Sequence, residues 1–175
     1  MVATDRIVAL RTAFEQVVAR LKGTFGALTT SEFRDNFRVH VEAERVEPVL
    51  AFLKADDFDM LAELGAADYL RYPNAKDRYG VWYILVNTTT GQRLIVKTFV
   101  NDPDPSLPSV YHLWKGSDWM EREVYDMYGV VFDGHPDMRR ILLPDEFTSF
   151  PLRKDYPMRG RGERHNFQPL TRSNS

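Results

Sequence analysis

The sequence predicts an α+β fold in which helices cover one face of a mixed β-sheet, followed by a long C-terminal tail. Apolar residues near the start recur at helical spacing, β-branched and aromatic runs follow up to residue 100, and proline, glycine and arginine crowd the region beyond residue 144. The 175 residues are 43% hydrophobic and 13% aromatic, which is enough for a single core. We therefore expect an α+β domain over residues 1–143 and an extended arm over residues 144–175.

The first expected element is a helix over residues 6–21. Thr4 can cap it and Gly23 can end it, because a short hydroxyl residue suits the first position and glycine suits the last. Its apolar face combines positions spaced three and four apart, namely Ile7, Leu10, Phe14, Val17, Val18 and Leu21.

The middle of the chain predicts a sheet. Residues 37–41 alternate apolar and polar side chains as a strand does, residues 46–53 return to helical spacing, and residues 58–69 fit a strand by their place in this order. The runs 80–87 and 93–100 are separated by five residues and read as a hairpin. The order helix, strand, helix, strand, strand, strand matches a ferredoxin-like split β-α-β sheet with helices on one face.

A connector and a further helix follow the hairpin. Residues 101–109 contain three prolines and predict an extended connector. Ser117 or Asp118 can cap a helix, Asp118 and Glu121 have the spacing of a capping box, and Gly129 is placed to end the helix. Residues 121–157 form the most informative segment of the chain, because charges, glycines and prolines lie there at spacings that no ordinary amphipathic helix requires. Residues 117–143 are the signature segment of the expected domain.

Charge is distributed unevenly along the chain. From residue 153 onward there are six basic and two acidic residues, which gives this part of the chain a net charge of +4. The whole chain has a net charge of −2, so residues 1–152 have a net charge of −6. A basic arm can bind nucleic acid, anionic lipid or an acidic protein surface. Nucleic acid fits least, because the folded part is acidic and lacks a recognised binding motif. We expect the arm to bind protein.

Several functions are excluded by what the sequence lacks. The absence of cysteine removes disulfides, thiolate nucleophiles and iron–sulfur ligation by this chain. No glycine-rich phosphate loop occurs in its required context, so no nucleotide site is expected. No apolar run reaches the roughly 20 residues of a membrane-spanning helix, and no signal peptide is evident. We expect a soluble, intracellular chain without its own cofactor.

The charged segment carries two motifs of unusual composition. The first is Glu-Arg-Glu, two residues, Asp, and then Gly-His-Pro, two residues, Arg-Arg-Ile; the second is Pro-Leu-Arg-Lys-Asp-Tyr-Pro. The residues that we single out in them are Glu121, Arg122, Glu123, Asp126, Gly134, His135, Pro136, Arg139, Arg140, Arg153, Lys154 and Asp155. This pattern resembles the thirty-kilodalton subunit of respiratory complex I, which is a component of the bacterial NADH:quinone oxidoreductases.

The resemblance implies a role within an assembly. It implies a non-catalytic structural subunit of the peripheral arm of a proton-translocating NADH:quinone oxidoreductase, with FMN and iron–sulfur clusters held by other subunits. It also implies binding to the quinone-site subunit, which resembles hydrogenase large subunits, and to neighbouring iron–sulfur subunits. The chain would then lie on the cytoplasmic face of the membrane, or on the matrix or stroma side of an organelle, and contact the membrane only indirectly.

The residues themselves allow competing roles for the first motif. Arg122 and Asp126 have the i,i+4 spacing of a surface ion pair, and we expect the helix charges to dock a neighbouring chain. Arg139 and Arg140 suit a carboxylate partner, with the 121–123 cluster as one internal candidate.

His135 has three possible roles. It is expected to hold the Gly-His-Pro loop by hydrogen bonds. The alternatives are a metal site that combines it with His112 and nearby acids, and acid/base catalysis with Glu121 and Glu123.

Two other functions remain open. One is an accessory subunit of a related ferredoxin-driven or hydrogenase-type membrane complex. The other is a free-standing acid/base enzyme, which requires a concave pocket containing Glu121, Glu123 and His135.

Overall fold

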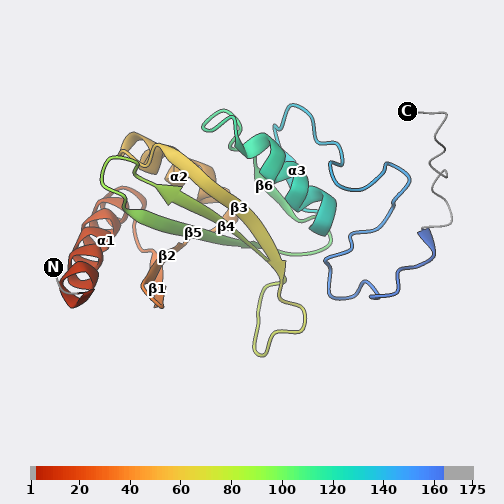
Figure 1. Cartoon of the computed structure of the whole chain (residues 1–175), viewed down its shortest axis with the longest axis horizontal. Coiled ribbons are helices and arrows are strands. Elements are labelled where there is room, and N and C mark those ends of the chain that lie inside the picture. The colour runs from red at the N-terminus through yellow and green to blue at the C-terminus, as the bar shows by residue number, and fades with distance from the viewer. Residues whose placement is uncertain (1–2, 164–175) are drawn as a thin grey trace.

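A computed structural model describes residues 3–163, which form a sheet with three helices and an irregular C-terminal segment (Figure 1). The helices are α1 (Ala3–Phe25), α2 (Val46–Ala55, after a 3-10 turn at Ala43–Arg45) and α3 (Ser117–Tyr128). The strands are β1 (Thr29–Phe33), β2 (Asn36–His40), β3 (Met60–Asp68), β4 (Tyr79–Val86), β5 (Arg93–Val100), β6 (Ser106–Pro108) and β7 (Val131–Asp133). Residues 164–175, with Arg164 and Arg172 of the predicted basic arm, lie outside this description.

The main sheet has five strands in the order β1-β2-β5-β4-β3. The pairing of β2 with β5 is parallel and the other three pairings are antiparallel. The predicted α+β class and mixed sheet are therefore confirmed. The predicted hairpin corresponds to β4 and β5, which are joined by residues 87–92.

Three short strands were not predicted. The edge strand β1 pairs with β2 through a tight turn at Arg34 and Asp35, whose φ angles of 49° and 61° match a two-residue hairpin turn. Because β1 is largely exposed, it lacks the apolar alternation of a half-buried strand. The two three-residue strands β6 and β7 form a separate parallel pair and are too short to show any periodicity.

The first helix extends beyond both predicted ends. It begins at Ala3, so that Thr4 lies inside the helix instead of capping it, and it continues past Gly23 to Phe25. Gly26 follows with a φ of +78°, and its N–H bonds to the carbonyl of Lys22. This left-handed residue ends the helix in the way that was predicted for Gly23. The side chain of Ile7 lies outside the described part.

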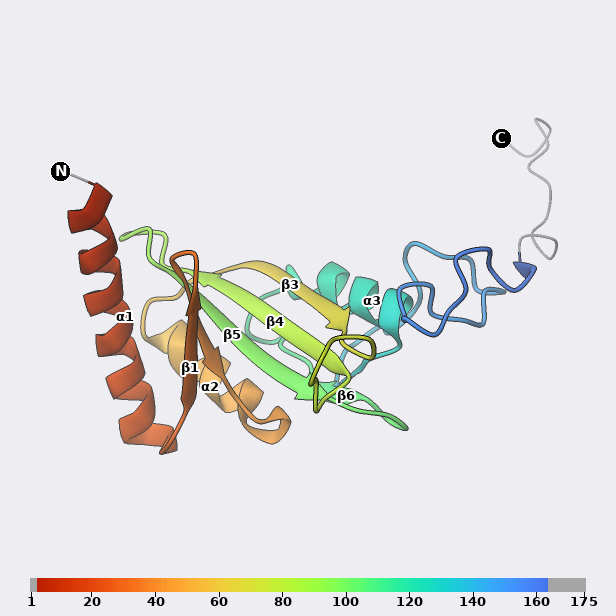
Figure 2. The ribbon, with the colours of Figure 1, turned by 90° about the horizontal axis from the view of Figure 1, so that it is seen from below.

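The core lies between one face of the sheet and the first two helices. On β4 and β5 every second side chain is buried, and the apolar face of α2 meets them with Val46, Val49, Leu50 and Leu53, all without exposed surface. Phe14 of α1 stacks on Phe37 of β2 with ring centroids 4.8 Å apart. The third helix packs beside the edge strand β3 (Figures 1 and 2).

Leu50→Ala should lower the free energy of unfolding by about 2–5 kcal/mol, because it leaves a cavity in a fully buried site. Val8→Ala is the matched control, since Val8 of α1 is 60% exposed and its truncation should change stability by less than about 0.5 kcal/mol. Urea unfolding of the isolated chain measures both. Equal effects of the two changes would contradict this core.

Candidate partner-binding site around the third helix

The third helix has a glycine at each end and no side-chain cap at its start. Its N-cap is Gly116, which has no side-chain cap, so the capping role predicted for Ser117 or Asp118 is wrong: both residues already lie in the first turn. Gly129 ends the helix as predicted, with a φ of +74° and an N–H bond to the carbonyl of Tyr125. The helix buries two carboxylates, Glu121 and Asp126, each with no exposed surface.

Glu121 connects the helix to the connector before it. One carboxylate oxygen accepts a hydrogen bond from the Ser109 hydroxyl at 2.7 Å, and the other accepts one from the Val110 backbone N–H at 2.8 Å. Burial raises the pKa of Glu121 above its ordinary value, and these hydrogen bonds only partly offset that effect. The residue fixes the position of the helix relative to residues 109–110.

His135 holds the loop that follows β7, as predicted. Its Nδ1 atom accepts a hydrogen bond from the backbone N–H of Asp137 at 3.0 Å, so a neutral His135 carries its proton on Nε2. The Nε2 atom lies 3.4 Å from Asp118 and 3.9 Å from Glu121. Among residues 3–163, no group of three or more His, Asp or Glu side chains is arranged to hold a metal ion.

Asp126 organises the segment after the loop. One oxygen accepts hydrogen bonds from three successive backbone N–H groups, those of residues 141, 142 and 143, at 2.8–3.1 Å. The other oxygen pairs with the Arg140 guanidinium at 2.6 Å, and this guanidinium also donates to the Ser149 carbonyl. Burial opposes ionisation of Asp126, but the hydrogen bonds from the Leu143 N–H, the Arg140 side chain and the other two N–H groups outweigh it and lower the pKa.

Two predicted pairings are thereby corrected. Arg122 does not pair with Asp126; it donates to the carbonyls of Arg139 and Arg140 at 3.0 and 3.2 Å. Arg140 pairs with Asp126, and Arg139 with Asp137 at 2.6 Å, so neither finds its partner in the 121–123 cluster. Arg122 and Asp126 lie on one helix, as their i,i+4 spacing predicts. The Asp126 side chain, however, points into the protein and cannot form the predicted surface ion pair.

The second motif docks on the domain itself. The Arg153 side chain donates to the Tyr128 carbonyl at 2.6 Å and lies over the ring of Phe150. The backbone N–H of Lys154 donates to the buried carboxylate of Asp68 at 2.8 Å. The tail is thus anchored to the end of α3 and to the end of β3.

An arginine of the fold completes this anchor. Arg78, just before β4, pairs with Asp68 at 3.1 Å and with Asp155 of the second motif at 2.9 Å. Neither Asp68 nor Arg78 was predicted, because each is a single charge at the end of a strand with no motif around it.

Several side chains around this framework remain exposed. Trp119 is 60% and Leu142 is 62% exposed, and 76% of the Arg139 side chain is accessible. The Arg122 guanidinium lies 5.3 Å from the Trp119 ring while it contacts residues 139 and 140, so it links the two parts of one surface. We call this surface, made by Trp119, Arg122, Arg139 and Leu142, the signature surface.

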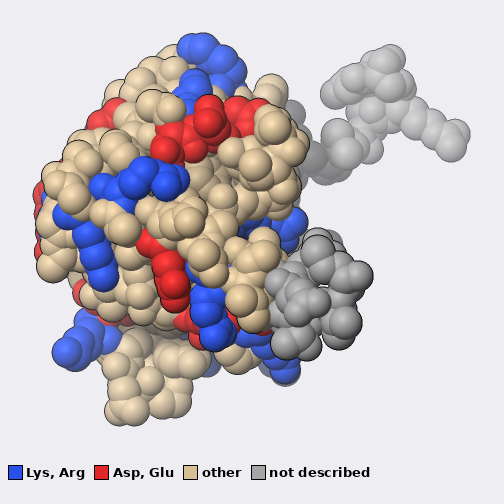
Figure 3. Space-filling model, turned by 90° about the vertical axis from the view of Figure 1, so that its left-hand side faces the viewer, with Lys and Arg blue, Asp and Glu red and all other residues tan. Residues whose placement is uncertain are grey.

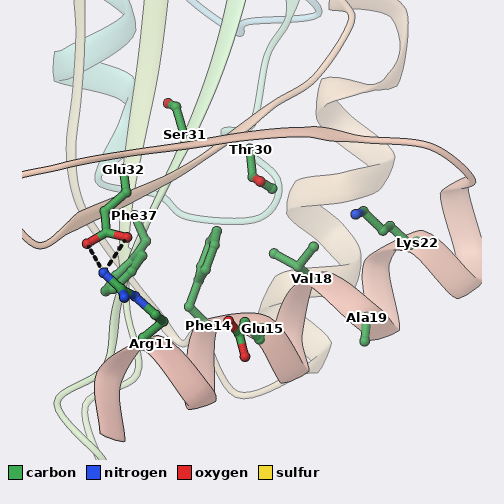
Figure 4. Close-up of a pocket in the computed structure, with 10 residues that line it drawn as sticks. All are labelled: Arg11, Phe14, Glu15, Val18, Ala19, Lys22, Thr30, Ser31, Glu32 and Phe37. Carbon is green, nitrogen blue, oxygen red and sulfur yellow. Dashed lines mark hydrogen bonds and ion pairs between the residues drawn. The ribbon is translucent and has the colours of Figure 1, made fainter. Parts of the chain in front are cut away.

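The pocket required for acid/base catalysis does not form. The side chains of Glu121 and His135 have no exposed surface, and Glu123 points outward from the helix. A cavity of about 450 Å³ lies elsewhere, between α1 and β1, where Phe14, Val18 and Phe37 line it beside the Arg11–Glu32 ion pair (Figure 4). It contains none of the three residues proposed for catalysis. A second hollow, between β3 and α3, is lined by Glu123 but by neither Glu121 nor His135.

The two buried carboxylates of α3 should give opposite pH profiles. The raised pKa of Glu121 means that its contribution to stability is complete below about pH 4.3 and is lost as the pH rises through the folded-state pKa. The lowered pKa of Asp126 means that its contribution is complete above about pH 3.9 and is lost as the pH falls.

Unfolding free energies of Glu121→Gln and Asp126→Asn, each compared with the wild type between pH 3 and 8, measure these profiles. The loss caused by Asp126→Asn should be about 3–5 kcal/mol at pH 7 and should shrink in acid, because the variant leaves Arg140 without its buried partner. The advantage of the wild type over Glu121→Gln should decrease as the pH rises. Profiles of the same sign would refute the assigned environments.

A comparison of Gly129→Ala with Gly134→Ala should separate the stability cost of backbone strain from the cost of disturbing the packing of the tail. An added Cβ at Gly129 would lie 2.6 Å from both Arg153 and the Phe150 ring, whereas at Gly134, which has a similar φ of +82°, it meets nothing within 4 Å. We expect Gly134→Ala to cost about 1 kcal/mol of strain and Gly129→Ala to cost at least that much again. Thermal unfolding compares them; equal costs would show that the tail does not pack on the helix end.

Known proteins share both the sequence and the fold. The family model described as "Respiratory-chain NADH dehydrogenase, 30 Kd subunit" matches residues 39–162. NADH-quinone oxidoreductase subunit 5 of Thermus thermophilus is 43% identical over 129 residues, 70% of this chain, and this match covers 62% of the Thermus protein. An NADH-quinone oxidoreductase subunit of Roseiflexus castenholzii is 40% identical, with 81% of this chain and 83% of that protein aligned.

Two solved structures resemble the fold. The trypsin-resistant fragment 1–134 of Nqo5 matches with a TM-score of 0.64 and 36% identity, over 73% of this chain and 98% of the fragment. A chain of the membrane-bound sulfane sulfur reductase, an archaeal respiratory membrane complex, matches with a TM-score of 0.72 and 24% identity, over 90% of this chain and 93% of that chain. The chain belongs to the family of the 30 Kd subunit of respiratory-chain NADH dehydrogenase.

Proposed function

We propose that this chain is a non-catalytic structural subunit of the peripheral arm of a proton-translocating NADH:quinone oxidoreductase. The observation that carries this proposal is how the charged residues of the first motif are arranged. Glu121 and Asp126 are buried and bind backbone N–H groups of their own chain, while Trp119, Arg139 and Leu142 remain exposed around them. Such an arrangement shapes a surface for a partner and keeps these two carboxylates away from any substrate.

The motif residues divide into two groups in this proposal. Glu123, Arg139 and Lys154 are exposed and would contact a neighbouring subunit directly. The remaining motif residues would hold the backbone on which these three side chains lie. They are Glu121, Arg122, Asp126, Gly134, His135, Pro136, Arg140, Arg153 and Asp155. An exposed tryptophan beside arginines is typical of the residues that contribute most to protein–protein binding.

The proposed partner is the quinone-site subunit, which resembles hydrogenase large subunits, with iron–sulfur subunits as further neighbours. FMN and the iron–sulfur clusters would reside in these chains, since the present chain has no cysteine to ligate a cluster. No helix within residues 3–163 has the length and apolar character needed to cross a membrane. We propose that other subunits hold the chain at the cytoplasmic face of the membrane.

Purification of the tagged chain from a mild-detergent membrane extract tests this function. Mass spectrometry should find flavin, iron–sulfur and membrane subunits, and NADH–quinone activity should belong to the assembly and not to the isolated chain. Co-purification of hydrogenase-type or ferredoxin-fed subunits would place the chain in a related complex instead. Turnover by the isolated chain would overturn the structural role.

Arg139→Glu should reduce the amount of assembled complex without lowering the melting temperature of the isolated chain. The side chain is largely exposed and its described ion pair is with the neighbouring Asp137, so its reversal changes the surface and not the core. Arg71→Glu, an exposed position in the loop between β3 and β4, is the control. A complex that assembles at normal yield but has lost quinone reduction would argue for a direct catalytic role of Arg139.

A further inference from the structure

The five-stranded sheet has a second face that no helix crosses. Helix α3 borders this face at β3, where Met120 and Glu123 line a groove together with Trp82. Helices α1 and α2 pack on the opposite face, and the view from below in Figure 2 shows the strands in front of α2. Side chains on this open face are partly exposed, and those at its centre are the large apolar residues Trp82, Ile84 and Ile95. A half-covered apolar surface of this kind is typical of a place where another element packs.

Strand register places these residues in rows across the sheet. In one row Arg38 of β2 lies beside Ile95 of β5, then Ile84 of β4, then Glu63 of β3. Because paired residues of neighbouring strands point to the same side, the row runs from a cation through two aliphatic residues to an anion. The apolar centre therefore has a positive side toward β2 and a negative side toward β3.

The next row has a different composition, with a histidine on β2, a lysine on β5, an aromatic residue on β4 and no anion on β3. His40 of β2 lies beside Lys97 of β5, then Trp82 of β4, then Gly65 of β3. Gly65 is required there because the indole of Trp82 occupies its missing side chain: an added Cβ would meet the ring at 2.8 Å. Trp82 is held flat over β3 by this contact and by its hydrogen bond to Glu63 at 3.0 Å.

The cations of the open face have no acidic partner within the described chain. Arg34 and Arg38 lie over the ring of Phe33, at 5.2 and 5.8 Å, and the Lys97 ammonium lies 4.4 and 4.7 Å from the rings of Tyr69 and Phe99. None of the three forms an ion pair with a carboxylate of residues 3–163.

The α1 end of the molecule differs only in part, because exposed Lys22 of α1 likewise forms no ion pair with a carboxylate of residues 3–163. At the α1 end of the molecule, basic and acidic side chains are interspersed (Figure 3), and two of the arginines of α1 pair with Glu32 and Asp56. Uncompensated cations on a domain with a net charge of −6 over residues 1–152 indicate a local preference for an anionic partner. The lowered pKa of His40, caused by burial and then by Lys97 and Arg38, agrees with this positive environment.

We propose that the open sheet face binds a segment of a neighbouring subunit that combines aliphatic side chains with carboxylates. The aliphatic side chains would cover Trp82, Ile84 and Ile95, and the carboxylates would pair with Arg38 and Lys97. The apolar centre with a charged rim is the usual anatomy of a protein interface. A nucleic acid would have to approach an acidic domain and would leave the aliphatic centre uncovered. This inference rests on the proposed function, because it takes the partner from the same complex.

Photo-crosslinking in the assembled complex tests this face directly. Benzoylphenylalanine replaces Ile95 in the tagged full chain, and the purified complex is irradiated and digested for mass spectrometry. A crosslink to a segment with both acidic and aliphatic residues on one neighbouring subunit is the expected result. Crosslinks only to lipid or to a segment without acidic residues, or an assembled complex without any crosslink, would overturn the proposal.

A charge reversal provides the second measurement. Arg38→Glu with Lys97→Glu should lower the yield of assembled complex about fivefold or more, and reversing the acidic residues of the crosslinked segment should restore it. Lys22→Glu, at an exposed position of α1 on the opposite side of the sheet, is the control. Melting curves exclude unfolding, and the milder Arg38→Gln serves if the double variant does not fold. Undiminished yield of the double variant would count against the proposal.

The two proposals fail in different ways. If the proposed function is wrong, the wild-type chain will not co-purify with the subunits of an NADH:quinone oxidoreductase. If only the present inference is wrong, the wild-type complex will assemble and the open face will give no crosslink to an acidic segment.

Discussion

The path of the chain after β7 depends on the carboxylate of Asp126. Residues 141–143 are not part of any strand, so their N–H groups have no ladder to join, and buried N–H groups without a partner are costly. One carboxylate oxygen accepts from all three, and the other holds Arg140, which in turn binds the Ser149 carbonyl. A single ionised side chain thus substitutes for secondary structure along this segment. The positions of Arg139 and Leu142 on the signature surface follow from it.

Glu121 and Asp126 lie less than two turns apart on α3 but differ in the groups around them. Glu121 accepts a neutral hydroxyl and one N–H, which do not balance the cost of burying its charge. Asp126 accepts three N–H groups and a guanidinium, which do. Both side chains have no exposed surface, but Glu121 lies deeper in the protein, so the greater cost of burial and the weaker set of donors together raise its pKa while the pKa of Asp126 is lowered.

Periodicity in the sequence was sufficient for the parts of the fold that bury a continuous apolar face. The helix around Leu50 and the hairpin of β4 and β5 could be predicted because their patterns extend over many residues. The edge strand β1 could not be predicted, because few of its side chains are buried. Strands β6 and β7 could not be predicted, because each has too few residues to show an alternating pattern. For the site, residue spacing identified the motif but not the residues that its side chains bind. Asp126 binds residues that lie 14 to 17 positions later in the chain, and Lys154 binds Asp68, which lies 86 positions earlier. Such long-range contacts leave no local signal.

The anchoring of the tail has a consequence for the order in which the molecule is completed during synthesis. Helix α3 is held through its Gly129 end by Phe150 and Arg153, and β3 and β4 are joined to the tail through Lys154 and Asp155. These anchors come after the residues that they position. The chain must therefore be synthesised through residue 155 before the signature surface has all of its supports.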